Sequence, residues 1–191
     1  MRVSSPRLGM GRRPGGVWAR GLAVGVAAAL LGGCSLVSKP VAPPCPPVYI
    51  LSDAARVTKF RPGPGRDLTD VMIEAEIVAF SGGCTHEPKK NEVVVDLQVG
   101  FDVRRGPAAN DRTAELTYFV AIPKFYPAAE AKGEFVVPVT FPEGVDQARV
   151  VDDQVVLRIP RAEKDTVDDY VIYLGFQTSP EELEMNRRMK R

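Results

Sequence analysis

The sequence predicts an all-β protein, an antiparallel β-sandwich followed by a short C-terminal helix. From residue 48 onward, apolar side chains recur at every second position in several segments, which is the period of a strand. Clusters rich in Gly, Pro, Asp and Ser separate these segments at the spacing of strand connections. Near the C-terminus, a Ser-Pro-Glu-Glu motif predicts the start of one helix.

Residues 92–104 form the clearest expected strand. Alternate positions make one unbroken apolar face, whereas charged and amide side chains dominate the other. No helix gives this pattern, because residues on one face of a helix recur every three or four positions. The apolar positions are Val93, Val95, Leu97, Val99, Phe101 and Val103.

The other expected strands are less regular. Residues 134–141 carry Pro138 on the outward face, and because proline donates no ladder hydrogen bond, this strand should be an edge or bulged one. Residues 170–178 are apolar on both faces, as in a central strand covered on both sides. In residues 149–159, Asp152-Asp153-Gln154 indicates a turn or a bulge. Further strands are expected at 71–80, at 116–122, and at 48–51 or 56–60.

Seven or eight such strands give an immunoglobulin-like architecture, but the likeness is architectural only. Antibody-type domains place a cysteine on each of two facing strands with a Trp between them. Here Cys45 precedes the first expected strand, Cys84 falls in an expected loop, and Trp18 is the only Trp. The sequence therefore leaves the strand order open.

A helix is expected at the C-terminal end. Ser179 is an N-cap residue, Pro180 takes the first helical position, and Glu182 completes the capping box. A helix this short needs side chains that pack on the domain. The apolar residues available for this are Leu183, Met185 and Met189.

The N-terminal residues have the pattern of an export signal. A leader with five arginines flanks an apolar run that is shorter than the roughly 20 residues of a membrane-spanning helix. The run ends in Leu31-Gly32-Gly33-Cys34, which resembles the lipobox of bacterial lipoprotein precursors. The resemblance implies that the signal peptide is cleaved before Cys34. It also implies that the Cys34 sulfur carries two acyl chains and its new amino group a third, palmitate being among them. Cys34 would then hold the protein to membrane lipid, and three acyl chains exceed what stable anchoring requires.

The same segment admits other interpretations. An ordinary signal peptide cut nearby and a retained membrane span both leave the Leu-x-Gly-Cys order unexplained. Arg12-Arg13 suggests twin-arginine export, but Pro14-Gly15-Gly16 lacks the polar and bulky apolar residues that usually follow that pair. Met10 is an alternative start, because a leader from there keeps three arginines.

Cleavage at this site would change the charge of the protein. The chain has 25 Lys and Arg against 24 Asp and Glu, and residues 1–33 hold five Arg and no acid, so the remainder has a formal charge of −4. Such a surface has no general attraction for nucleic acid, and no nucleic-acid partner is expected.

The expected organisation is a signal peptide (1–33), a Pro-rich tether (34–47), one β-sandwich domain (48–178) and a C-terminal helix or tail (179–191). Prolines in the tether favour the extended polyproline II form, and ten such residues span on the order of 30 Å. With Cys34 assigned to lipid, Cys45 and Cys84 remain as an even pair in an oxidising compartment. We expect them to form a disulfide bond; two free buried thiols are the alternative.

The sequence contains few residues suited to catalysis. His86 is the only histidine, and a zinc site with Cys84 would break the expected disulfide. Ser81 lacks a Gly-x-Ser-x-Gly elbow. The alternating Pro and Gly of residues 61–65 remove the amide donors of a phosphate cradle and predict a rigid turn.

Two acidic pairs, Asp152-Asp153 and Asp168-Asp169, are expected at strand ends, where loops cluster. If they converged they would suit Ca²⁺ or glycoside hydrolysis, although solvated turn aspartates are the commoner outcome. We expect no catalytic residue, no metal and no cofactor.

The expected function is that of a cell-envelope lipoprotein, a non-enzymatic binding or scaffolding module. Ser35 after the cysteine resembles the pattern of lipoproteins sorted to the outer membrane, which implies a location facing the periplasm. An envelope protein or peptidoglycan is the expected partner, and Phe125 and Tyr126 are the exposed aromatic candidates for contact. The alternatives are a cell-wall glycan or peptide hydrolase using loop carboxylates, and a carrier of a small apolar ligand.

Overall fold

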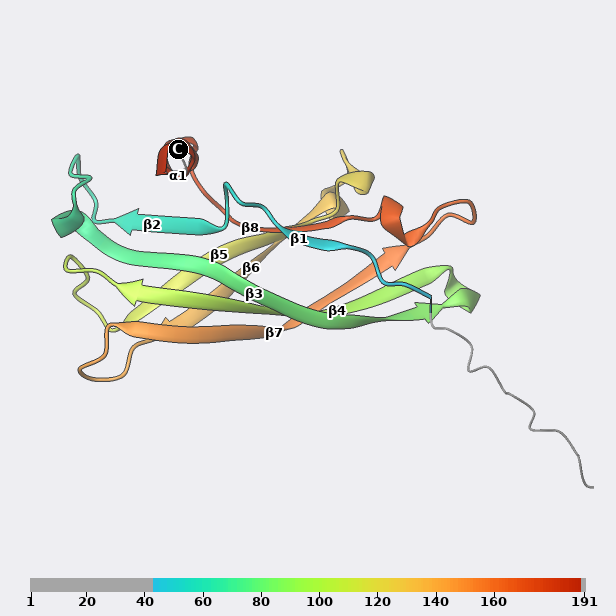
Figure 1. The fold of residues 1–191 in the computed structure, drawn as a ribbon, viewed down its shortest axis with the longest axis horizontal. Coiled ribbons are helices and arrows are strands. Elements are labelled where there is room, and N and C mark those ends of the chain that lie inside the picture. The colour runs from blue at the N-terminus through green and yellow to red at the C-terminus, as the bar shows by residue number, and fades with distance from the viewer. Residues whose placement is uncertain (1–42, 190–191) are drawn as a thin grey trace, which may run out of the picture. The chain divides into compact units, whose positions relative to one another are not determined.

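The computed structural model describes residues 43–189. Cys34, the leader and most of the Pro-rich segment lie outside the described residues. Within them, eight strands and one C-terminal α-helix confirm the predicted fold class (Figure 1). The elements are β1 (Val48–Ile50), β2 (Arg56–Phe60), β3 (Val71–Glu87), β4 (Glu92–Arg105), β5 (Thr113–Ala121), β6 (Lys132–Thr140), β7 (Gln147–Pro160), β8 (Ile172–Phe176) and α1 (Pro180–Met189).

The strands form two four-stranded sheets. Sheet 1 has the order β1-β8-β5-β6, and sheet 2 has the order β2-β3-β4-β7. All pairs are antiparallel except β1 and β8. In sheet 2, β2, β3 and β4 are three consecutive strands side by side, which neither sheet of a constant-type immunoglobulin domain contains. The likeness to immunoglobulin domains therefore stops at the layered architecture.

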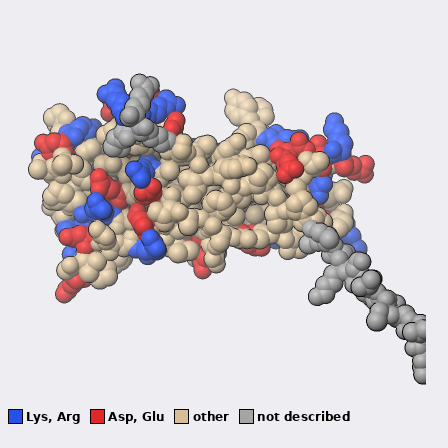
Figure 2. Space-filling model, viewed as in Figure 1, with Lys and Arg blue, Asp and Glu red and all other residues tan. Residues whose placement is uncertain are grey.

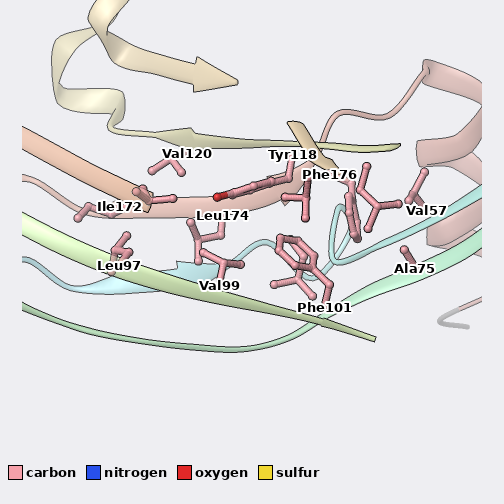
Figure 3. Close-up of a cluster of buried hydrophobic side chains, with 14 of the residues drawn as sticks. Val57, Ala75, Leu97, Val99, Phe101, Tyr118, Val120, Ile172, Leu174 and Phe176 are labelled. Atoms are coloured by element: carbon pink, nitrogen blue, oxygen red, sulfur yellow. The ribbon is translucent and has the colours of Figure 1, made fainter. Parts of the chain in front are cut away.

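β4 supplies the centre of the core between the two sheets. Its six alternating apolar residues are buried, with at most 3% of any of them exposed, as the sequence predicts. Figure 3 shows Phe101 of β4 facing Tyr118 and Phe176 of sheet 1. The Phe101 ring centroid lies 5.1 Å from that of Tyr118 and 5.8 Å from that of Phe176. Such aromatic pairs add to the burial energy that holds the layers together.

β3 is longer than the sequence indicates. We expected it to end at residue 80, but it continues until Glu87 pairs with Glu92 at the start of β4. The turn lies instead at Pro88–Lys90, followed by Asn91 in the left-handed conformation with φ 50°. The hydrogen-bonded ladder to β4 outweighs the turn preference of the glycines in this segment.

The predicted turn at Ser81-Gly82-Gly83 is therefore wrong, and Cys84 and His86 lie on a strand instead of in a loop. Gly82 has another reason to be glycine. A Cβ atom at this position would lie 2.1 Å from the backbone oxygen of Asp96 on β4. The glycine permits close approach of two strands, and no turn is needed to explain it.

β7 contains the bulge that the sequence allows. Leu97 of β4 pairs with Val155, and Val99 pairs with Asp152, so two residues of β7 lie opposite one residue of β4. Asp152 and Asp153 thus lie in the middle of a strand. The expectation that this acidic pair sits at a strand end among loops is wrong.

Two further strand predictions are confirmed. β6 is an edge strand of sheet 1, and its Pro138 is exposed, as expected for a residue that cannot donate to a ladder. β8 lies between β1 and β5 and buries both Leu174 and its neighbour Gly175, whose positions face opposite sides of the sheet. β8 is therefore covered on both faces.

Helix α1 begins with the predicted capping box. The Glu182 N–H donates to the Ser179 hydroxyl at 3.2 Å, and the Ser179 N–H donates to the Glu182 carboxylate at 2.7 Å. The helix docks through a residue that its apolar pattern does not reveal. Asn186 is buried, and its amide donates to the backbone oxygens of Asp53 at 3.0 Å and Arg56 at 2.8 Å. Leu183 and Met185 are only partly buried.

The predicted disulfide bond joins Cys45 to Cys84, with the Cα atoms 5.6 Å apart. Cys45 precedes β1 at the edge of sheet 1, whereas Cys84 lies on β3 of sheet 2, so the bond links the two sheets at one open side of the sandwich. The neighbouring chain is also held. Pro46 is buried, and Pro47 accepts a hydrogen bond from the Ile172 N–H at 2.9 Å. The last residues of the Pro-rich segment are thus part of the packed domain.

Replacing both disulfide cysteines, Cys45→Ala with Cys84→Ala, should lower the free energy of unfolding by about 2–5 kcal/mol, because a loop spanning 39 positions would no longer be closed in the unfolded chain. Urea unfolding followed by circular dichroism measures this change. Val156→Ala, at an exposed position on β7, is the matched control and should change stability by less than about 0.5 kcal/mol. A double variant as stable as the wild type would contradict the role of the bond.

Candidate interaction surface

The carboxylate of Asp152 has a structural partner. The bulge in β7 directs it toward sheet 1, where it accepts a hydrogen bond of 2.8 Å from the hydroxyl of Tyr118. Tyr118 is fully buried (Figure 3), and a buried hydroxyl without a partner would be destabilising. Burial, and then the nearby Asp152 carboxylate, raises the pKa of Tyr118 well above its usual range. Asp152 therefore provides the hydrogen-bond acceptor for the buried hydroxyl of Tyr118.

The structure does not bring the two acidic pairs together. Asp152 lies in mid-strand, whereas Asp168 lies in a 3₁₀ turn (Val167–Asp169) between β7 and β8. Asp169 caps that turn, accepting hydrogen bonds from the Thr166 N–H at 2.8 Å and hydroxyl at 3.0 Å. These bonds lower the pKa of Asp169. Among residues 43–189, no three His, Cys, Asp or Glu residues are grouped as a metal site would require.

His86 and Ser81 also have local partners. The Nε2 atom of His86 lies 3.1 Å from the backbone oxygen of Pro44, beside the disulfide. Because Cys84 is in that disulfide, it provides no thiolate for a zinc site. The Ser81 hydroxyl donates to the Gln98 side chain at 3.3 Å across the sheet.

The two aromatic candidates, Phe125 and Tyr126, lie next to each other in the loop after β5 but differ in exposure. Phe125 ends a 3₁₀ turn (Pro123–Phe125), and its ring packs 5.7 Å from the ring of Tyr170. Tyr126 follows and is 81% exposed. Asp165 supports this loop, since it pairs with Lys124 at 3.0 Å and accepts a hydrogen bond from Tyr170 at 2.8 Å. Only Tyr126 is free to contact a partner.

The loops lie at two opposite ends of the strands. Because β1 runs parallel to β8, Cys45 lies at the end that holds residues 88–91, 122–131 and 161–171, which we call the Cys45 end (Figure 1). Here the Arg161 N–H donates to the Asn91 backbone oxygen at 2.7 Å. We call the other end, with residues 61–70, 106–112 and 141–146, the far end. Tyr126 therefore lies at the Cys45 end.

The most exposed apolar side chain at the far end is Leu68, in the loop of residues 61–70 that joins β2 to β3. We call this segment the Leu68 loop. Leu68 is 81% exposed. It opens a 3₁₀ turn (Leu68–Asp70) capped by Asp67, whose carboxylate accepts hydrogen bonds from the Thr69 N–H at 2.8 Å and hydroxyl at 2.6 Å. The loop presents an apolar side chain on a fixed backbone.

Internal contacts make the Leu68 loop rigid. The Arg66 guanidinium donates to the backbone oxygens of Gly63 at 2.8 Å and Gly65 at 2.7 Å. Asp70 is buried, and its carboxylate lies 2.5 Å from the Arg61 guanidinium. A Cβ atom on Gly65 would lie 2.2 Å from that carboxylate, so only glycine fits there. The sequence predicts the rigid turn but not the exposure of Leu68, because burial depends on the whole fold.

The outer face of sheet 2 has a shallow hollow of about 710 Å³, and half of its lining residues, from β2, β3, β4 and β7, are charged. Arg149 clamps Asp102 through two hydrogen bonds of 2.6 and 2.7 Å, and Arg56 pairs with Glu76 at 2.9 Å. The Arg149 contact lowers the pKa of Asp102. Positive and negative side chains lie side by side on this end of the molecule (Figure 2), so the hollow has no net charge with which to attract an ion.

Comparison with known proteins gives no family assignment. The chain matches no protein-family model, and no curated protein or solved structure matches it either. No helix within residues 43–189 is long and apolar enough to cross a membrane.

Tyr118→Phe should change how stability depends on pH. Because the pKa of Tyr118 is raised in the folded state, its contribution to stability is complete below the unfolded-state pKa of about 10 and is lost as the pH rises further. Urea unfolding between pH 8 and 11 should therefore show a steeper alkaline loss for the wild type than for Tyr118→Phe. Equal slopes would show that the tyrosine does not resist ionisation.

Proposed function

We propose that the protein is a lipoprotein anchored to the cell envelope, a non-enzymatic binding module that presents the Leu68 loop to a partner. The lipobox Leu31-Gly32-Gly33-Cys34 supports the anchor. Ser35 favours the outer membrane, with the domain facing the periplasm. The disulfide bond of Cys45 suits an oxidising compartment.

The observation that carries the proposal is that the Cys45–Cys84 bond lies at one end of the sandwich, a few residues after the lipobox cysteine in the sequence. Nine residues separate Cys34 from Pro44, and they lead directly to the Cys45–Cys84 bond. In polyproline II form these residues span about 28 Å. Attachment through Cys34 would connect the Cys45 end to the membrane by a short segment. The far end, with its Leu68 loop, would then be the end available to other envelope components.

Metabolic labelling with an alkynyl fatty acid tests the anchor. The wild type should be labelled and should sediment with membranes, whereas Cys34→Ala should lose the label and become extractable without detergent. The matched control is the double variant Cys45→Ala, Cys84→Ala, which should keep the label because those cysteines form the disulfide. Labelling that persists in Cys34→Ala would refute lipid attachment at this residue.

The Leu68 loop suits recognition for an energetic reason. An exposed leucine on a preorganised loop binds a partner without first losing backbone entropy, which is a cost that flexible loops carry. The Arg66 guanidinium also lies 5.4 Å from the ring of Phe60, the last residue of β2, and this contact holds the loop against the strand. The chemistry fits an apolar pocket on an envelope protein.

A photocrosslinking residue at position 68, benzoylphenylalanine in place of Leu68, should give a discrete crosslinked band in intact cells. The same residue in place of Val151, which is 56% exposed on β7, is the matched control and should not give that band. Leu68→Asp should leave the thermal unfolding midpoint unchanged, because the side chain is 81% exposed, and should abolish co-purification of the crosslinked protein. Identical bands from positions 68 and 151 would mean that the loop has no specific partner.

A further inference from the structure

The loop after β5 carries an exposed apolar tip. Residues 125–129 read Phe-Tyr-Pro-Ala-Ala and contain no charged side chain. Residues 126–129, which we call the Tyr126 tip, are all exposed, and Tyr126 itself is 81% exposed. In Figure 1 this loop, drawn in yellow, projects from the sandwich between β5 and β6. Contiguous exposed apolar residues mark interaction sites more often than single ones do.

The backbone of the tip is suited to a medium with little water. The Tyr126 N–H donates to the Pro123 oxygen at 3.0 Å, and the Ala128 N–H donates to the Phe125 oxygen at 2.8 Å. Pro127, between them, has no N–H group. Residues 126–128 therefore expose no unbonded backbone donor. An unpaired donor is most costly in lipid, where no water replaces the missing partner, so this arrangement favours contact with lipid.

The Tyr126 tip lies close to the point where the chain enters the domain. Tyr49 of β1, Tyr173 of β8 and Ala121 of β5 form one row across sheet 1. Because neighbouring strands lie about 4.8 Å apart, β1 and β5 are about 10 Å apart in this row. Cys45 lies four residues before the row and Tyr126 five residues after it. Both segments therefore leave the sheet at the Cys45 end.

We propose that the Tyr126 tip contacts the headgroup region of the membrane that holds the acylated Cys34, with the tyrosine ring at the interface between lipid and water. This inference rests on the proposed anchor. Even fully extended, the residues between Cys34 and Pro44 reach only about 36 Å, so the anchor keeps the Cys45 end next to the lipid surface. Tyrosine side chains concentrate at such interfaces, because the ring is apolar and the hydroxyl stays in water.

The tether explains why so small a patch is sufficient. One tyrosine, one proline and two alanines bury too little apolar surface for stable binding of a free domain. A short tether, however, gives the tip an effective concentration on the order of millimolar at the membrane, so a weak contact is populated. The bound tip would orient the domain, with the far end and the Leu68 loop turned away from the lipid.

Net charge does not contribute to this contact. The loops of the Cys45 end, residues 88–91, 122–131 and 161–171, carry five Lys and Arg and five Asp and Glu. Lys124, beside the tip, is paired with Asp165 at 3.0 Å. The end therefore has no net charge that would attract anionic lipids or be repelled by them. The contact should depend on the apolar tip and should be insensitive to salt.

Vesicles of brominated phosphatidylcholine test the contact, because bromine quenches tryptophan emission only at close range. In the acylated full chain, Trp18→Phe is combined with Tyr126→Trp or, as matched control, with Leu68→Trp at the equally exposed position of the far end. The emission of Tyr126→Trp should fall at least about twofold, and that of Leu68→Trp should stay nearly unchanged. Loss of the quenching in high salt would contradict an apolar contact.

A second probe checks that the tip itself makes the contact. Ala128→Trp should also be quenched. Adding Tyr126→Asp should remove most of that quenching, because a carboxylate resists transfer into the interface. Adding Val151→Asp, at an exposed valine on β7, is the matched control and should leave the quenching unchanged. Equal quenching with Tyr126→Asp and Val151→Asp would overturn the role of the tyrosine at the membrane.

Fatty-acid labelling of the same samples separates this inference from the proposed anchor. Labelled protein whose Tyr126→Trp emission is unquenched, or is quenched as much as that of Leu68→Trp, would overturn the membrane contact alone. An unlabelled wild type would overturn the anchor and the contact with it. In intact cells, benzoylphenylalanine in place of Tyr126 should give no protein crosslink. A discrete protein band would show that a protein covers the tip, and would overturn the contact with lipid.

Discussion

The ladder between β3 and β4 is the interaction on which the rest of the structure depends. β4 carries the apolar face that fills the core, and β3 follows it from Ile73 opposite Arg105 to Glu87 opposite Glu92. Because this ladder continues through the glycines, Cys84 reaches the side of the sandwich where Cys45 enters it. A shorter β3 would leave the two sheets without their covalent link.

The same ladder explains why one edge stays open. β2 has five residues and covers only the first part of β3, which has seventeen. Within the uncovered part, residues 77–85 contain no charged residue and no proline, and the ladder to β4 is interrupted by a bulge at Val78. The disulfide lies near the end of this uncovered part and links it to the chain that enters β1 of sheet 1.

The polar groups that sequence analysis considered for chemistry are mostly engaged in holding the fold. Asp152 accepts a hydrogen bond from Tyr118, Asp169 caps a turn, and His86 contacts the segment that enters β1. Leu68 at the far end and Tyr126 at the Cys45 end are the most exposed large apolar side chains among residues 43–189, each 81% exposed. These two side chains are the exposed apolar positions on which the proposed binding function relies.

The sequence alone determined the fold class, the six-residue apolar face of β4 and the helix cap at Ser179, because these follow from local patterns. It predicted the pairing of Cys45 with Cys84 only once the lipobox resemblance had assigned Cys34 to lipid, and the structure contains that bond. It also supplies the whole basis for the anchor that we propose at Cys34. Only the tertiary structure decided the length of β3, the inward turn of Asp152 and the exposure of Leu68. Each of these depends on which strand lies alongside, and such pairing joins residues far apart in the chain, so no local pattern records it.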